Sequence, residues 1–151
     1  HLHATPGNVV DYDFVEAKLL AANKQYDIQT LGTDPWMSRM LSQRLMKEEI
    51  NAVEIPQNMK HMSPAMKMIE ILMKSGHMTH EKNPVARWCW GNVVVAVDGN
   101  ENIKPMKNLS RDRIDLTVAL INAMATAMLF EDVQIDVSEF AEQDVLDKLW
   151  G

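Results

Sequence analysis

The stretch that decides the fold is residues 27–36, which read DIQTLGTDPW. Residues 27–33 favour a buried strand, and the strand pattern ends on Asp34 and Pro35. A carboxylate at the end of a buried strand is costly unless a cation or a hydrogen-bond donor meets it. In open parallel sheets, ligands bind at the carboxyl ends of strands, so Asp34 is a candidate binding residue. The alternative is an ordinary helix cap, since Asp-Pro commonly opens a helix.

The segments on both sides of this stretch alternate between helix and strand patterns. Asp11 and Asp13 precede apolar residues at helical spacing and suit the cap and first turn of a helix. A second helical stripe follows the stretch, and residues 52–55 predict another short strand. The order helix, strand, helix, strand predicts a parallel sheet. The helical stripes consist of Val15, Leu19 and Ala22 before the stretch and Met37, Met40, Leu41 and Leu45 after it.

The second half of the chain predicts three helices and a hairpin. Ser63-Pro64 and Asn83-Pro84 predict the starts of two helices, and Gly76 predicts the end of the first. Alternating valines lead to the turn signal Asp98-Gly99, so residues 91–105 predict a β-hairpin. A last, strongly apolar helix is expected from about residue 110 to residue 130.

Asp115 is the candidate functional residue on that last helix. It begins a stripe of small and polar residues that continues with Ala119, Asn122 and Thr126 between two apolar stripes. Such a stripe permits close approach of a ligand or a metal-bound water. The alternative is a structural acid that helps the helix begin and pairs with Arg111 or Arg113. If Asp115 and Asp34 converge, the two carboxylates suit a divalent metal ion.

Composition restricts the class of protein to which the chain can belong. The chain has 151 residues, of which 46% are hydrophobic and 24% are charged, so it is long enough for one domain with a core. It has no run of about 18 apolar residues and no targeting pattern at its start, so we expect no membrane segment and an intracellular protein. The single cysteine, Cys89, excludes an intramolecular disulfide and is expected in the core.

Charge is distributed unevenly along the chain. Residues 1–130 carry 14 acidic and 14 basic residues, whereas residues 131–151 carry the other 7 acidic residues and one basic residue, Lys148. We therefore expect a body at 1–130 and an acidic C-terminal tail at 131–151. A basic patch within the body either faces solvent without a ligand or binds phosphate groups. A metal site beside the patch would favour phosphate binding. The patch consists of Lys104, Lys107, Arg111 and Arg113.

Several segments taken together resemble the nuclease domain of tailed-bacteriophage terminase large subunits. They occur in the order and with about the spacing of that family and span roughly residues 5–129. The segments are residues 5–13 (TPGNVVDYD), 33–36 (TDPW), 83–88 (NPVARW) with 92–95 (NVVV), 99–105 (GNENIKP), and 113–115 (RID) followed by 118–120 (VAL).

The resemblance implies an α/β, ribonuclease H-like fold, in which a mixed sheet flanked by helices carries acidic residues that bind two ions of Mg²⁺ or Mn²⁺. In such terminases the domain cuts concatemeric double-stranded viral DNA, and a separate ATPase domain drives packaging. The small subunit and the portal protein are the implied partners, in the host bacterial cytoplasm. Asp34 matches the family's carboxylate after the fourth strand, and Asp115 matches the one on the final helix. Lys104 and Lys107 match an arm near DNA, with Arg111 and Arg113 beside it.

The chain departs from the family pattern at two places. Leu116 stands where a glycine is expected, and the family's first metal-binding aspartate belongs to strands upstream of residue 5. We therefore expect the first strands to be missing, which would leave this fragment weak in metal binding and in cutting. An unpaired edge on the strand at 27–33 would then favour a homodimer. Two other readings stay open: a docking module for the portal or small subunit in which the aspartates only cap helices, and a resolvase or transposase of the same fold.

Overall fold

The computed structural model describes residue 5, residues 7–35 and residues 39–130, apart from the side chains of 39 and 40. The chain divides into two compact units, residues 1–55 and residues 56–151. The acidic tail and Met37 lie outside the described residues. Each unit is described by itself below.

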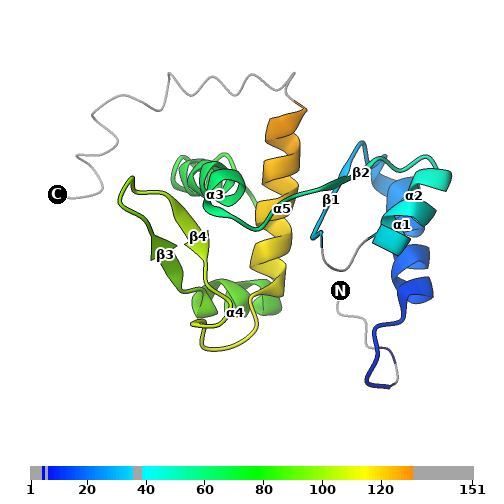
Figure 1. Cartoon of the computed structure of the whole chain (residues 1–151), viewed down its shortest axis with the longest axis horizontal. Helices are drawn as coiled ribbons and strands as arrows, with labels where there is room; N and C mark the ends of the chain where they lie inside the picture. Colours follow the sequence, from blue (N-terminus) through cyan, green and yellow to red (C-terminus); the bar gives the residue numbers. More distant parts are fainter. Residues whose placement is uncertain (1–4, 6, 36–38, 131–151) are drawn as a thin grey trace. The chain divides into compact units, whose positions relative to one another are not determined.

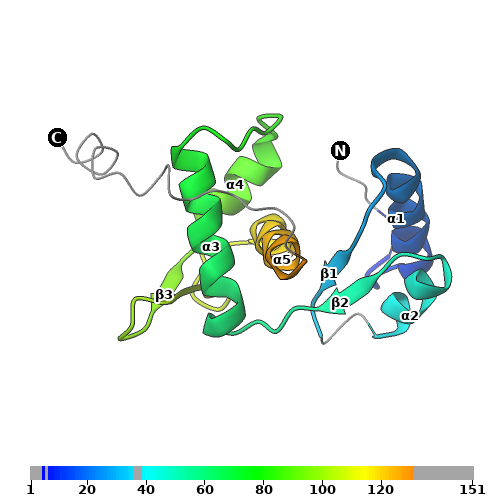
Figure 2. The ribbon, with the colours of Figure 1, turned by 90° about the horizontal axis from the view of Figure 1, so that it is seen from above.

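The first unit consists of α1 (Tyr12–Tyr26), β1 (Leu31–Thr33), α2 (Arg39–Lys47) and β2 (Ala52–Glu54). The two strands pair in parallel, with Leu31 opposite Ala52 and Thr33 opposite Glu54, as the alternating pattern predicted. Both helices lie on the same side of the strand pair (Figures 1 and 2). The core of this unit is small: Leu41, Leu45 and Ile50 are buried, with partly buried residues of α1 and β1 packed against them.

The helix cap predicted at the start of α1 is confirmed, but the strand that follows is shorter than predicted. The Asp11 carboxylate accepts a hydrogen bond from the backbone N–H of Phe14, and Asp13 lies in the first turn. Asp27 does not begin a strand. It adopts a left-handed backbone conformation with φ 51° and closes the C-terminus of α1, which leaves only residues 31–33 for β1.

The second unit consists of α3 (Met59–Lys74), α4 (Pro84–Asn92), β3 (Val95–Val97), β4 (Ile103–Pro105) and α5 (Asp115–Leu129). Strands β3 and β4 form the predicted antiparallel hairpin. Figures 1 and 2 show α3 between the hairpin and α5, and α3 and α5 cross one another. The buried side chains gather where these helices meet, and they include Cys89, as predicted. They are Met62, Ser63, Ala65, Ile69, Cys89, Ile114, Thr117, Ile121, Asn122, Ala125 and Thr126.

Two predicted helix starts were wrong, and both errors have the same cause. Helix α3 begins at Met59 with Asn58 as its cap, and the Ser63 hydroxyl instead accepts a hydrogen bond from the backbone N–H of Ile103 at 3.0 Å. Helix α5 begins at Asp115, and the Ser110 hydroxyl instead bonds two backbone groups of the hairpin. In each case a serine that could cap a helix is used for a tertiary contact.

The predicted end of α3 and start of α4 are confirmed. Gly76 has φ 75° and follows the last turn of α3, a conformation that glycine adopts without steric cost. The Asn83 side chain accepts hydrogen bonds from the backbone N–H groups of Val85 and Ala86, with Pro84 in the first helical position. None of the described helices combines the length and the hydropathy that a membrane span requires.

Candidate functional site

Asp34 lies directly after β1, at the carboxyl end of the parallel pair, as predicted. The backbone N–H of Ile55 donates to the carbonyl of Thr33 at 2.8 Å, and the Thr33 hydroxyl donates to the carbonyl of Val53 at 3.2 Å. These two bonds fix the backbone from which Asp34 projects. Its side chain is half-buried. Pro35 lies in a turn, and residues 36–38, which would form the first helical turn after an Asp34 cap, lie outside the described residues, so the cap alternative stays a prediction.

Asp115 is the first residue of α5, where a negative charge is favoured by the helix dipole. Its side chain is 62% exposed, and Oδ1 accepts a hydrogen bond from Lys107 Nζ at 2.9 Å. The structural alternative predicted a partner at Arg111 or Arg113, but the partner is Lys107. An exposed ion pair of this kind contributes about 0–1 kcal/mol, so it orients the carboxylate more than it stabilises the fold. Oδ2 of Asp115 makes no hydrogen bond within the described residues.

The two carboxylates belong to different units, Asp34 to the first and Asp115 to the second. Their convergence on a metal ion therefore stays a prediction. Among the residues that the structure describes, no group of three or more His, Cys, Asp or Glu side chains could hold a metal ion. Both aspartates offer the hard oxygen donors that Mg²⁺ and Mn²⁺ prefer, but a site built on them needs further oxygen ligands.

The predicted basic residues lie on β4 and on the loop that joins it to α5. Lys104 is within β4 and is half-buried, and Lys107, Arg111 and Arg113 are exposed on the loop. The loop is anchored at both ends. The Ser110 hydroxyl donates to the carbonyl of Met106 at 2.8 Å, and the Asn92 side chain donates to the carbonyl of Arg113 at 3.3 Å. The segment therefore presents its cations from a fixed backbone beside Asp115.

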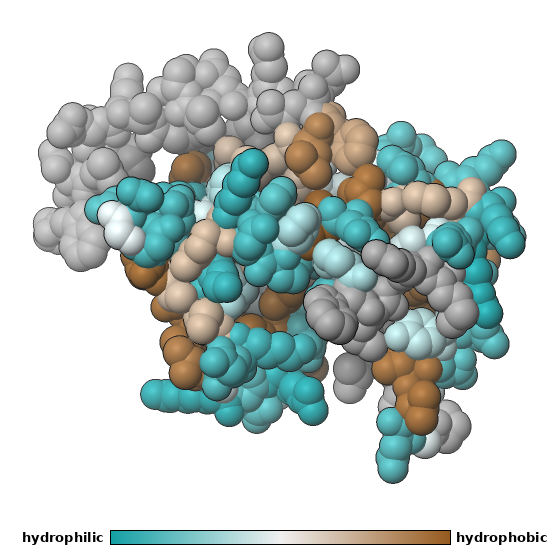
Figure 3. Space-filling view, in the orientation of Figure 1, coloured by the Kyte–Doolittle hydropathy of each residue, from teal (hydrophilic) through white to brown (hydrophobic). Residues whose placement is uncertain are grey.

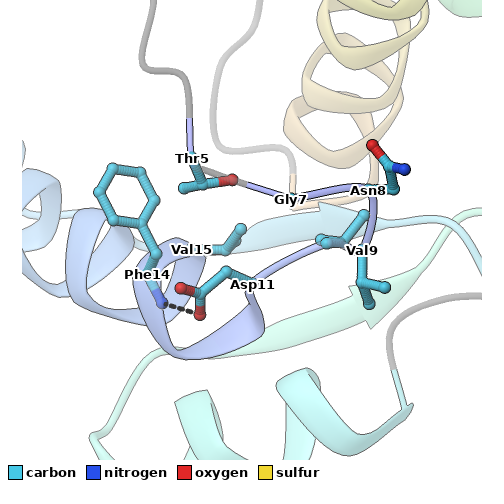
Figure 4. Close-up of a pocket in the computed structure, with 8 residues that line it drawn as sticks. Thr5, Gly7, Asn8, Val9, Asp11, Phe14 and Val15 are labelled. Carbon is cyan, nitrogen blue, oxygen red and sulfur yellow. Dashed lines mark hydrogen bonds between the residues drawn. The ribbon is translucent and has the colours of Figure 1, made fainter.

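A shallow pocket of about 360 Å³ lies before α1, in the segment at 5–13 that carries part of the resemblance. Figure 4 shows Thr5, Gly7 and Asn8 along one wall and Val15 opposite, with the bond from the Phe14 N–H to Asp11 in the foreground. Because Asp11 is the α1 cap and is the one ionisable group among the described residues that line the pocket, these residues offer no set of ligands for a metal.

Sequence reasoning missed a polar contact that fixes the chain between β2 and α3. Gln57 Nε2 donates to Oδ1 of Asn122 at 3.0 Å, and Asn122 is buried in the middle of α5. The signal was present, because an asparagine on a predominantly apolar helix needs a hydrogen-bond partner. The partner itself lies 65 residues away in the sequence, so spacing could not identify it.

Comparisons with known proteins agree on one family. A family model described as "Terminase large subunit, endonuclease domain" matches residues 2–131. Protein YmfN of Escherichia coli (strain K12) is 40% identical over 132 residues, which are 86% of this chain and 29% of that protein. The terminase large subunit of Enterobacteria phage HK97 is 34% identical over 130 residues, which are 83% of this chain and 25% of that protein. The chain thus spans less than a third of either relative's length.

Two solved structures are similar to this one. The crystal structure of the HK97 bacteriophage large terminase matches with a TM-score of 0.73 and 32% identity, over 82% of this chain and 26% of that chain. The large terminase nuclease from thermophilic phage G20c matches in fold, with a TM-score of 0.62 and 17% identity, over 83% of this chain and 66% of that chain. The predicted α/β, ribonuclease H-like fold class is confirmed, although the described strands form two separate pairs.

Proposed function

The chain belongs to the family of terminase large subunit endonuclease domains, and from that premise we propose that it is the part of a DNA-packaging endonuclease that cuts double-stranded viral DNA. The observation that carries the proposal is the position of Asp34 and Asp115, one at the carboxyl end of a parallel strand and the other at the start of a helix beside a basic loop. Both positions suit carboxylates that act on an anionic substrate with the help of cations.

The proposed roles of the side chains follow from their chemistry. Asp34 and Asp115 would hold Mg²⁺ or Mn²⁺. When bound, such ions activate water and stabilise the charge that develops on a phosphodiester. Lys107 orients Asp115 through its bond to Oδ1, which leaves Oδ2 available for another partner. Lys107, together with Lys104, Arg111 and Arg113, would also neutralise DNA phosphates without reading bases, because lysine and arginine contacts to the backbone carry no sequence information.

Further parts of the proposal concern the rest of the protein. We propose that residues 1–130 act as nuclease domain and residues 131–151 as a separate acidic segment, and that an ATPase domain belongs to the same polypeptide. The partners would be DNA, the terminase small subunit and the portal protein, in the host bacterial cytoplasm.

Within the described residues β1 pairs with β2 alone, so its other edge is open to pairing with a second copy. Light scattering that shows only monomer would contradict such a homodimer.

Plasmid cleavage tests the nuclease proposal. The full-length protein that carries this chain should nick and linearise supercoiled DNA with Mn²⁺ and should stop when EDTA is added. Asp34→Asn and Asp115→Asn should each lower the cleavage rate by at least about a hundredfold, because a lost metal ligand removes several kcal/mol of transition-state stabilisation. Asp27→Asn and Asp112→Asn are matched controls, because these exposed aspartates lie close in sequence to Asp34 and Asp115 and have no proposed metal role. Asp27 accepts a hydrogen bond from the Gln29 side chain, and Asp112 accepts one from the Arg113 N–H.

The outcomes also separate the alternatives. Undiminished Mn²⁺-dependent cleavage by both variants would refute the assignment of Asp34 and Asp115. A protein that does not cleave DNA with either ion, but binds the portal or the small subunit in EDTA, would be a docking module. Cleavage restricted to branched junctions would indicate a resolvase.

A further inference from the structure

An apolar groove lies between α3 and the β3–β4 hairpin, and its lining includes none of the candidate nuclease residues. Its volume is about 330 Å³, and its apolar lining comes from Met66, Ile69 and Met73 of α3, Trp90 of α4, and Val95 and Ile103 of the two strands. Two lining residues are charged, Glu70 and Lys74, and they pair with each other at 2.6 Å. The described residues of the groove therefore offer no unpaired charge to an ionic ligand.

The groove is open to solvent at both sides. Met73 is 47% exposed on α3, and Val95 is 40% exposed on β3. Figure 3 shows brown and tan surface in the region of the hairpin, between teal stretches. Apolar side chains that line a hollow mark an interaction site more often than scattered apolar residues do. The volume is near the lower limit of about 300 Å³ for ligand pockets, so it suits a few side chains of another segment.

The chain itself supplies a segment with matching chemistry. Residues 131–151 carry large apolar residues among their acidic ones. Ala141, Val145 and Leu149 are four residues apart, and so are Leu146 and Trp150. This spacing is typical of an amphipathic helix, whose apolar stripe can enter a groove while its acidic residues face water. Moving large apolar side chains from water to an apolar surface lowers the free energy.

The tail is also attached within reach of the groove. It follows Phe130 at the end of α5, and α5 packs against α3, which forms one wall of the groove. Twenty extended residues span up to about 70 Å, whereas a domain of about 100 residues has a radius of gyration near 13 Å. A tethered segment of this length has an effective concentration of about millimolar, so even a weak contact is populated.

We propose that the C-terminal tail docks into this groove, with apolar side chains of residues 145–150 inserted between α3 and the β3–β4 hairpin. The occupant is the protein's own tail, bound within one molecule. The interaction does not require metal, DNA or the nuclease activity proposed above. It buries apolar side chains of the tail together with those of the groove.

Hydrogen exchange followed by mass spectrometry on the full-length protein tests this docking. Amides of residues 141–150 should exchange at least about tenfold more slowly than in an unstructured peptide, at low and at high protein concentration alike. Met73→Lys should remove that protection because it places a charge in the groove wall. Val97→Lys is the matched control, because it adds the same charge to the β3–β4 hairpin at a residue that is 64% exposed and does not line the groove.

A second pair of variants approaches the contact from the tail and leaves the folded units unchanged. Leu149→Asp should remove the protection, and Gln143→Asp, which adds the same charge off the two apolar stripes, should keep it. Unprotected tail amides in the wild type would overturn the proposal, as would equal protection in Met73→Lys and Val97→Lys. Protection that appears only at high concentration would also overturn it, since the occupant would then be a second copy.

Discussion

The two units hold their candidate carboxylates by different means. In the first unit α1 has no buried residue and packs on a small buried cluster of Leu41, Leu45 and Ile50, and the pairing of two short strands fixes the backbone before Asp34. In the second unit α5 buries several residues against α3 and α4, but Asp115 is held by an exposed lysine. The well-packed helix α5 thus carries an exposed side chain, Asp115, whereas the lightly packed first unit carries Asp34 on a backbone fixed by hydrogen bonds.

Truncations in the two cores test this comparison with the largest expected effect. Leu45→Ala and Ile121→Ala each remove a fully buried side chain and should each cost about 2–5 kcal/mol of unfolding free energy. Hydrogen exchange should rise within residues 12–55 for Leu45→Ala and within residues 59–129 for Ile121→Ala. Equal acceleration of both regions by either variant would show that the two units unfold as one.

Lys107 sharpens the contrast between a firm helix and a loosely held carboxylate. Lys107→Ala should weaken DNA binding and also release Asp115, so cleavage should fall by about tenfold more than with Arg113→Ala. Both variants should reduce the slope of log affinity against log salt by about one, because each removes one phosphate contact. Binding titrations at several salt concentrations and cleavage rates at saturating DNA measure the two effects. Equal losses in cleavage would contradict an orienting role for Lys107.

Helix caps offer a smaller and matched comparison between the units. Asp11→Ala removes the bond to the Phe14 N–H of α1, and Asn83→Ala removes the bonds to two N–H groups of α4. Each should lower the unfolding free energy by about 1 kcal/mol. Because α1 buries no residue, Asp11→Ala should also increase fraying of that helix in hydrogen exchange. Unchanged exchange of α1 in Asp11→Ala would mean that packing, not the cap, holds its first turn.

The hairpin turn gives the smallest expected effect, through pH. Hydrogen bonds from the Asn102 side chain and backbone hold the pKa of Asp98 below its ordinary value. A lowered pKa in the folded state means that the ionised carboxylate stabilises the turn above the unfolded pKa of about 3.9, and that this contribution is lost as pH falls through the folded value. The difference in urea midpoint between wild type and Asp98→Asn should be present at neutral pH and disappear in acid. A difference independent of pH would contradict this.

Local signals in the sequence predicted most of the elements. The parallel pair, the hairpin, the Asp11 and Asn83 caps and the end of α3 at Gly76 all depend on residues close together in the chain. The two wrong helix starts depended on serines whose hydroxyls bond distant backbone groups. The partner of Ser63 is Ile103, 40 residues away, and no local pattern indicates such a contact.

The candidate site likewise has features that local sequence signals predict and features that depend on tertiary contacts. The functional roles of both aspartates and of all four basic residues stay predictions, but the sequence predicted correctly that Asp34 follows a parallel strand. It gave Asp115 the wrong partner and placed it one turn inside a helix, because the helix start at Ser110 was wrong. The true partner, Lys107, reaches Asp115 because the intervening loop is anchored by Ser110 and Asn92. Loop geometry of this kind depends on tertiary contacts that residue spacing does not encode.

Manganese binding measured calorimetrically in a double-mutant cycle tests the central claim most directly, namely that Asp34 and Asp115 share a metal site. Asp34→Asn and Asp115→Asn should each weaken Mn²⁺ binding by at least about tenfold, and the double variant should lose little more than either alone, because ligands of one site are strongly coupled. If each variant leaves Mn²⁺ affinity unchanged, or if the two losses simply add, the two carboxylates do not act on one metal centre.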